Sequence, residues 1–142
     1  MATDDALARK AQADMVIERA AQQLRLLLEE AARELRPFPP FPGAFFTNAV
    51  EVSLEGVARP DIGCIVVAED GRLYELEMKI DFGEEFGDVV DPVQARDETL
   101  KKLDDLHPRD EAVLAYNALT QLTELLLERG QASQARGGAA PD

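Results

Sequence analysis

Three charged residues stand at a spacing that suits metal-assisted phosphate chemistry. Asp61 opens one apolar segment, and Glu77 and Lys79 flank Met78 near the end of the next segment. Carboxylate oxygens are ligands that Mg²⁺ and Mn²⁺ prefer in proteins. A lysine beside such an ion can position a water molecule and stabilise charge on a phosphate. The pattern therefore predicts a site for a divalent-metal-dependent phosphodiesterase.

A predicted β-hairpin brings these three residues together. The turn Glu69–Gly71 is typical of a three-residue hairpin loop with glycine in the left-handed conformation. Counting back from the turn gives four cross-strand pairs: Val67 with Leu73, Ile65 with Glu75, Gly63 with Glu77, and Asp61 with Lys79. Paired residues, and residues two apart on a strand, share one face of a sheet. The opposite face is predicted to be apolar, with Ile62, Cys64, Val66, Tyr74, Leu76 and Met78.

This hairpin resembles the PD-(D/E)XK nuclease superfamily in the segments Arg59–Ile62 and Tyr74–Lys79. The core of that superfamily, the restriction-endonuclease-like core, is a helix, three antiparallel strands and a helix, usually followed by a further strand. The resemblance covers roughly residues 20–106. A further strand at residues 112–116 is left open, although the spacing of the apolar residues there favours a helix.

The resemblance also implies roles for individual residues. Asp61 and Glu77 are expected to bind the metal, and Lys79 is expected to be the catalytic base or the charge stabiliser. The resemblance also implies one more acidic residue in the site, which comes from the first helix or the first strand. Three acidic residues remain open for this position: Glu30, Glu34 and Glu51.

The surrounding sequence predicts a single α+β domain over residues 1–130. A long helix is predicted over residues 4–36, which lack proline and glycine and have apolar residues at steps of three and four. Four prolines in residues 37–46 predict a Pro/Phe-rich connector. Alternating and β-branched residues then predict three antiparallel strands. Their ranges are Thr47–Leu54, Ile62–Ala68 and Arg72–Ile80.

The remaining chain is predicted to be mainly helical. An acidic loop over residues 81–91 precedes a helix at residues 92–106, and a last helix follows from Asp110 to Arg129. Gly130 is the predicted C-cap of that helix. The tail at residues 131–142 has no large apolar side chain and is predicted to be disordered.

The composition restricts the partners. Of 142 residues, 28 are Asp or Glu and 15 are Lys or Arg, so the formal net charge is -13. A charge of this sign repels polyanions, which disfavours nucleic acid and anionic membranes as partners. The single cysteine, Cys64, and the absence of a signal-peptide pattern predict a cytoplasmic protein.

A second, non-enzymatic hypothesis fits the same charge. The chain is then a small acidic adaptor or chaperone-like module that forms a homodimer through its N-terminal helix and binds a protein partner. This hypothesis places the three charged residues of the hairpin on open surface rather than in one pocket. It also predicts that changes at Leu24, Leu27 or Leu28 disrupt assembly.

Overall fold

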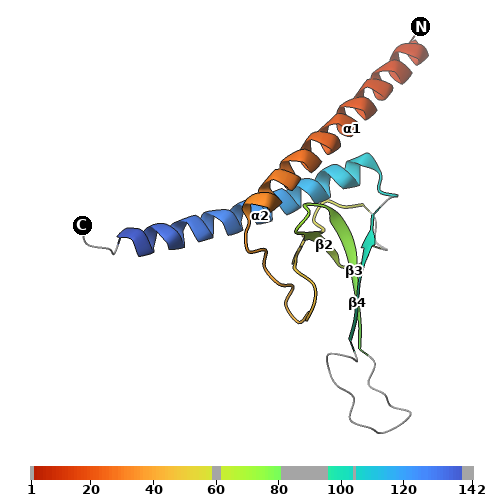
Figure 1. Ribbon diagram of the computed structural model, residues 1–142. Helices are drawn as coiled ribbons and strands as arrows, with labels where there is room; N and C mark the ends of the chain where they lie inside the picture. Colours follow the sequence, from red (N-terminus) through yellow and green to blue (C-terminus); the bar gives the residue numbers. More distant parts are fainter. Residues whose placement is uncertain (1, 59–61, 81–95, 104, 139–142) are drawn as a thin grey trace, which may run out of the picture.

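The computed structural model describes residues 2–58, 62–80, 96–103 and 105–138 (Figure 1). Within these ranges the chain has an α+β architecture, with two long helices and one antiparallel sheet of strand order β1-β2-β3-β4. The helices are α1 (Ala2–Glu34) and α2 (Pro108–Gly138). The strands are β1 (Ala49–Glu51), β2 (Ile65–Ala68), β3 (Leu73–Ile80) and β4 (Arg96–Lys102).

Helix α1 confirms the predicted long N-terminal helix and has two different halves. Residues 2–16 are all exposed, and this half extends beyond the sheet and α2 (Figure 1). Buried residues begin at Ala21 and continue through Leu28 to Ala32. The helix ends shortly before Pro37, whose ring is incompatible with a helix interior.

The main core lies between the two helices and one face of the sheet. Leu28 of α1, Leu114 and Leu122 of α2, and Ile65 and Val67 of β2 are almost fully buried there. Burying each of these side chains stabilises the fold by about 1.5–3 kcal/mol relative to leaving it exposed. The helices cross obliquely over this face (Figure 1).

The Pro/Phe-rich connector contributes Phe38 to this main core, and its later part packs on the opposite face of the sheet. Phe41 is buried in a second cluster with Ala49, Val66 and Leu76. Glu98 of β4 binds the connector in addition to these apolar contacts. Its carboxylate accepts hydrogen bonds from the backbone N–H groups of Phe45 at 2.7 Å and Phe46 at 3.1 Å, and from the Thr47 hydroxyl at 2.7 Å.

The prediction of a helix at residues 92–106 is wrong for residues 96–102, which form β4. This strand pairs with β3 in register from Tyr74–Lys102 to Ile80–Arg96. Its sequence contains helix-forming residues, but pairing with β3 from Tyr74 to Ile80 overrides that local preference. Residues 81–95, which include the predicted acidic loop, lie outside the described residues.

The predicted end of the last helix is also wrong. Helix α2 continues through Gly130, which does not adopt the positive φ of a C-cap glycine, and reaches Gly138. Residues 131–138 are therefore helical rather than disordered, and residues 112–116 are helical too. One helix and the strand β4 thus replace the two predicted C-terminal helices. In the described chain, neither helix combines the length and apolar character needed to cross a membrane.

Candidate functional site

The β2–β3 hairpin has the predicted register where the structure describes both strands. Val67 pairs with Leu73, and Ile65 pairs with Glu75. The ladder extends one position further, because the Leu76 N–H donates to the Cys64 carbonyl at 2.8 Å. The turn sequence and the alternation of side chains therefore specify this register correctly.

Close packing fixes the turn of this hairpin against α1. Gly71 has φ +79°, and a Cβ atom built on it would lie 2.5 Å from Glu29 Cα. An L side chain is therefore excluded both by the left-handed backbone and by the neighbouring helix.

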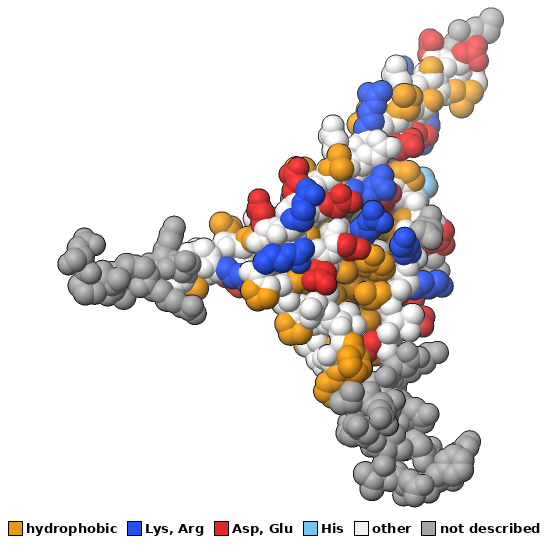
Figure 2. All heavy atoms as spheres, in the orientation of Figure 1, with side chains coloured by type: hydrophobic (Ala, Val, Ile, Leu, Met, Phe, Trp, Pro, Cys, Tyr) orange, Lys and Arg blue, Asp and Glu red, His pale blue; other side chains and the backbone are white. Residues whose placement is uncertain are grey.

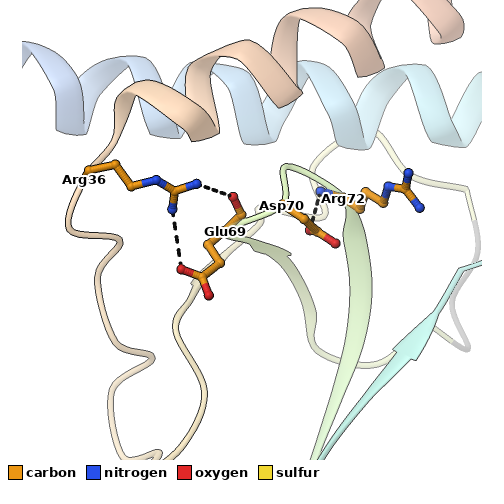
Figure 3. A network of polar contacts seen from close by, with 4 residues as sticks. All are labelled: Arg36, Glu69, Asp70 and Arg72. Atoms are coloured by element: carbon orange, nitrogen blue, oxygen red, sulfur yellow. Dashed lines mark hydrogen bonds and ion pairs between the residues drawn. The ribbon is translucent and has the colours of Figure 1, made fainter.

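Polar contacts hold the same turn from both sides (Figure 3). The Arg36 guanidinium donates to the Glu69 carbonyl at 3.1 Å and contacts the Glu69 carboxylate at 3.4 Å. Asp70 accepts the Arg72 N–H at 2.9 Å and the Tyr74 hydroxyl at 2.5 Å. The hydrogen bond to Asp70, followed by burial, raises the pKa of Tyr74 to about 12.

The structure describes the predicted metal site only in part. Glu77 is exposed on β3, opposite Thr99 of β4. The position of Lys79 shares the face of Glu77, because the two residues are two positions apart on one strand. Asp61 lies outside the described residues. The exposure of Glu77 thus agrees with the open surface that the non-enzymatic hypothesis expects for this residue.

The strand β4 places a further acidic residue at this site. Asp97 pairs with Lys79, so its position falls on the face that holds Glu77. Sequence reasoning missed Asp97 because it assigned residues 92–106 to a helix. The available signal was the alternation of Asp97, Thr99 and Lys101, which only becomes informative once the segment is known to be a strand.

The three candidates for the additional metal ligand, Glu30, Glu34 and Glu51, do not complete a metal-binding cluster among the described residues. Glu51 pairs with Val66 and lies on the connector face of the sheet, opposite to the face of Glu77. Glu30 and Glu34 are exposed on α1. Among the described residues, no three His, Cys, Asp or Glu side chains are grouped so that they could hold a metal ion.

The two faces of the hairpin are used differently from the prediction. The helices cover the face of Ile65, Val67 and Leu73, which is also the face of Glu75 and Glu77. Ile62 packs against this core instead of joining Cys64 on the other face. Burial, followed by the nearby charges of Glu51 and Glu75, raises the pKa of the Cys64 thiol, so the sulfur stays protonated at neutral pH.

A second candidate site is the outward face of α1. Val16 and Leu26 are 63% and 61% exposed, and Met15 and Leu27 are about half exposed. These residues do not belong to the apolar core, although Leu26 also lines a cavity between α1 and the hairpin turn. In contrast, Leu28 is fully buried and Leu24 packs against the core. Of the three leucines that were expected to mediate assembly, Leu27 alone is therefore available on the surface, where it is about half exposed.

Comparisons of the chain with known protein families, with curated proteins and with solved structures find no match.

Proposed function

We propose that the chain is a non-enzymatic acidic module that forms a homodimer through α1 and binds a protein partner. The observation that carries this proposal is the outward face of α1. Four large apolar side chains are exposed there, although the chain as a whole is highly charged. Exposed apolar side chains that cluster on one face are typical of interaction surfaces.

The spacing of the residues on this face suits an antiparallel pair of identical helices. Val16, Arg19, Gln23 and Leu26 follow at steps of three and four, which keeps them on one helical stripe. Val16 and Leu26 are equally far from Ala21, and so are Arg19 and Gln23. A twofold axis on the outward face, at the height of the buried Ala21, therefore sets Val16 against Leu26 of the second copy, as a self-complementary interface requires.

The charges at both ends limit the extent of this contact. The same axis sets Arg9 against Arg33 of the second copy, and like charges in register destabilise a helix pair. The favourable contact is thus confined to residues 12–30, a length of about 27 Å at 1.5 Å per residue. Completing the burial of each exposed apolar side chain contributes about 1 kcal/mol, so we expect a dimer of moderate affinity.

Sedimentation equilibrium of the native chain and of Val16→Glu tests this proposal. The native chain is expected at twice the chain mass of 15.6 kDa, and the variant at the chain mass, because it buries an unpaired charge in the interface. Leu7→Glu is the matched control, since Leu7 is equally exposed on a different side of α1 and should leave the dimer intact.

Circular dichroism must first show that all three proteins have the same helix content. A native chain that sediments as a monomer at every concentration would contradict the proposal. So would a Val16→Glu variant that remains as dimeric as the native chain.

One observation favours a second proposed function, a divalent-metal-dependent, nuclease-like phosphodiesterase at the hairpin. The strand register gives Glu77, Lys79 and Asp97 positions on one face of the sheet. Carboxylates on neighbouring strands are suitable ligands for Mg²⁺ or Mn²⁺, and such an ion supplies Lewis acidity toward a phosphate. Asp61 is expected to add a further ligand, and Lys79 to stabilise charge on the phosphate.

A calorimetric titration with Mn²⁺ tests this second proposal without a choice of substrate. We expect a defined site in the native chain that is lost in Asp61→Ala, Glu77→Ala and Asp97→Ala. Glu18→Ala, which removes a remote carboxylate on α1, should retain it. Weak binding that all the variants share would reflect only diffuse attraction to an acidic surface, and would remove the metal site from consideration.

A further inference from the structure

A cavity of about 450 Å³ lies where α1 meets the hairpin turn, the end of β4 and the start of α2. This volume falls within the range of about 300–1,000 Å³ that is usual for small-molecule sites. Apolar side chains line part of the cavity, among them Leu28, Leu73, Leu103 and Leu106. Figure 2 shows Lys and Arg side chains beside hydrophobic side chains in this region.

The cavity has more basic than acidic side chains, although the chain as a whole is acidic. Arg25, Arg72 and Lys102 line it together with Glu29 and Glu111. Arg25 and Glu111 neutralise each other through an ion pair of 2.9 Å. Within the described part of the chain, Arg72 and Lys102 form no such ion pair. With Glu29 included, the described lining residues carry one more positive charge than negative.

The two basic side chains come from neighbouring strands. Lys102 pairs with Tyr74, and Arg72 is two positions from Tyr74, so the two residues are diagonal neighbours on the connector side of the sheet, and they meet the cavity at its edge beside the hairpin turn. Figure 3 shows the Arg72 side chain pointing away from the ion pair of Arg36 and Glu69. A guanidinium and an ammonium group at this spacing can together hold one carboxylate or one phosphate group.

We propose that this cavity binds a small organic anion with an apolar body. The leucine side chains accept the apolar body, and Arg72 and Lys102 bind the anionic head at the rim. A medium-chain carboxylate and an alkyl phosphate both have this chemistry. The residues that form the cavity come from α1, the sheet and α2 of one chain, so the inference does not need the dimer proposed above, although the two surfaces share Leu26.

Calorimetric titration of the full chain with octanoate, with octyl phosphate and with 1-octanol tests the proposal. We expect saturable binding of at least one of the two anions, at a stoichiometry of one per chain. The neutral alcohol should bind at least about tenfold more weakly, because it cannot form charge-assisted hydrogen bonds. The tighter of the two anions identifies the head group.

Variants then locate the bound anion. Arg72→Gln and Lys102→Gln should each weaken its binding at least about tenfold. Lys101→Gln is the matched control: this lysine is the adjacent residue of β4, but does not line the cavity, and its variant should bind like the native chain. Arg72 and Lys102 are both exposed, so we expect the variants to fold.

Three results would overturn the proposal. The first is the absence of saturable binding for both anions. The second is equal affinity for 1-octanol and the anions, which would leave the basic side chains without a role. The third is unchanged affinity in a double variant that carries Arg72→Gln and Lys102→Gln, which would place the anion elsewhere on the chain.

Discussion

Tyr74 and Asp70 connect the hairpin turn to the first residues of β3. The hydroxyl of Tyr74 donates to the Asp70 carboxylate, and this bond raises the pKa of Tyr74 to about 12. A pKa above the ordinary value of about 10 means that the protonated phenol stabilises the fold. This contribution is complete below pH 10 and is lost as the pH rises through 12.

We therefore expect Tyr74→Phe to lower the free energy of unfolding by about 1 kcal/mol at neutral pH. Urea unfolding measures this difference, and a titration of tyrosinate absorbance should lose the transition near 12. The control Tyr116→Phe changes an exposed tyrosine of α2 and should retain that transition. Equal stability of Tyr74→Phe and the native chain would mean that the bond contributes nothing.

Glu98 supports the connector through its charge. Burial alone would raise the pKa of this carboxyl group, but hydrogen bonds from Thr47, Phe45 and Phe46 lower it below the ordinary value. A lowered pKa means that the ionised carboxylate stabilises the fold above the unfolded-state pKa of about 4.3. The stabilisation is lost as the pH falls through the pKa of the folded state.

Glu98→Gln should accordingly destabilise the protein by about 1 kcal/mol at pH 7, and by progressively less as the pH falls below about 4. Urea unfolding at a series of pH values measures the difference from the native chain. Glu77→Gln is the matched control on the exposed surface of β3, and should stay within about 0.5 kcal/mol of the native chain. A difference that is independent of pH would contradict the account of Glu98.

At the scale of elements, Gly130 distinguishes the observed helix α2 from the predicted shorter one. Gly130 lies inside α2, and nothing lies within 4 Å of the place where a Cβ atom would be. Gly130→Ala should therefore stabilise the protein by about 0.5–1 kcal/mol, as measured by urea unfolding. A C-cap glycine would give the opposite sign, because alanine is strained at positive φ.

Gly71→Ala provides the contrasting substitution. We expect it to destabilise the protein by more than about 1 kcal/mol, because of its positive φ and its contact with Glu29.

Destabilisation by Gly130→Ala would contradict the account of α2, because it would show that the helix ends near Gly130.

Local signals were sufficient to predict α1 and the hairpin. The turn Glu69–Gly71 and the alternating residues beside it specify the register of β2 and β3, and with it the shared face of Glu77 and Lys79. The strand β4 was not predictable in the same way, because Leu100 is the single apolar residue among its seven. Its conformation depends on pairing with β3, a contact that no local pattern contains, and Asp97 was missed for that reason.

At the scale of the whole molecule, charge and assembly oppose each other. A formal net charge of -13 repels a second copy of the chain, whereas the outward face of α1 attracts it through apolar contact. Salt screens the repulsion and leaves the apolar contact intact, so the dimer is best measured at moderate ionic strength.

Site-directed thiol cross-linking tests the antiparallel dimer most directly. In a chain whose Cys64 is replaced by alanine, a cysteine at Gln23 lies beside the proposed twofold axis, and a cysteine at Gln12 lies about 27 Å from its counterpart. A short bismaleimide should therefore join two copies of Gln23→Cys, but not two copies of Gln12→Cys. Cross-linking of both variants would indicate parallel helices, and cross-linking of neither would contradict the dimer.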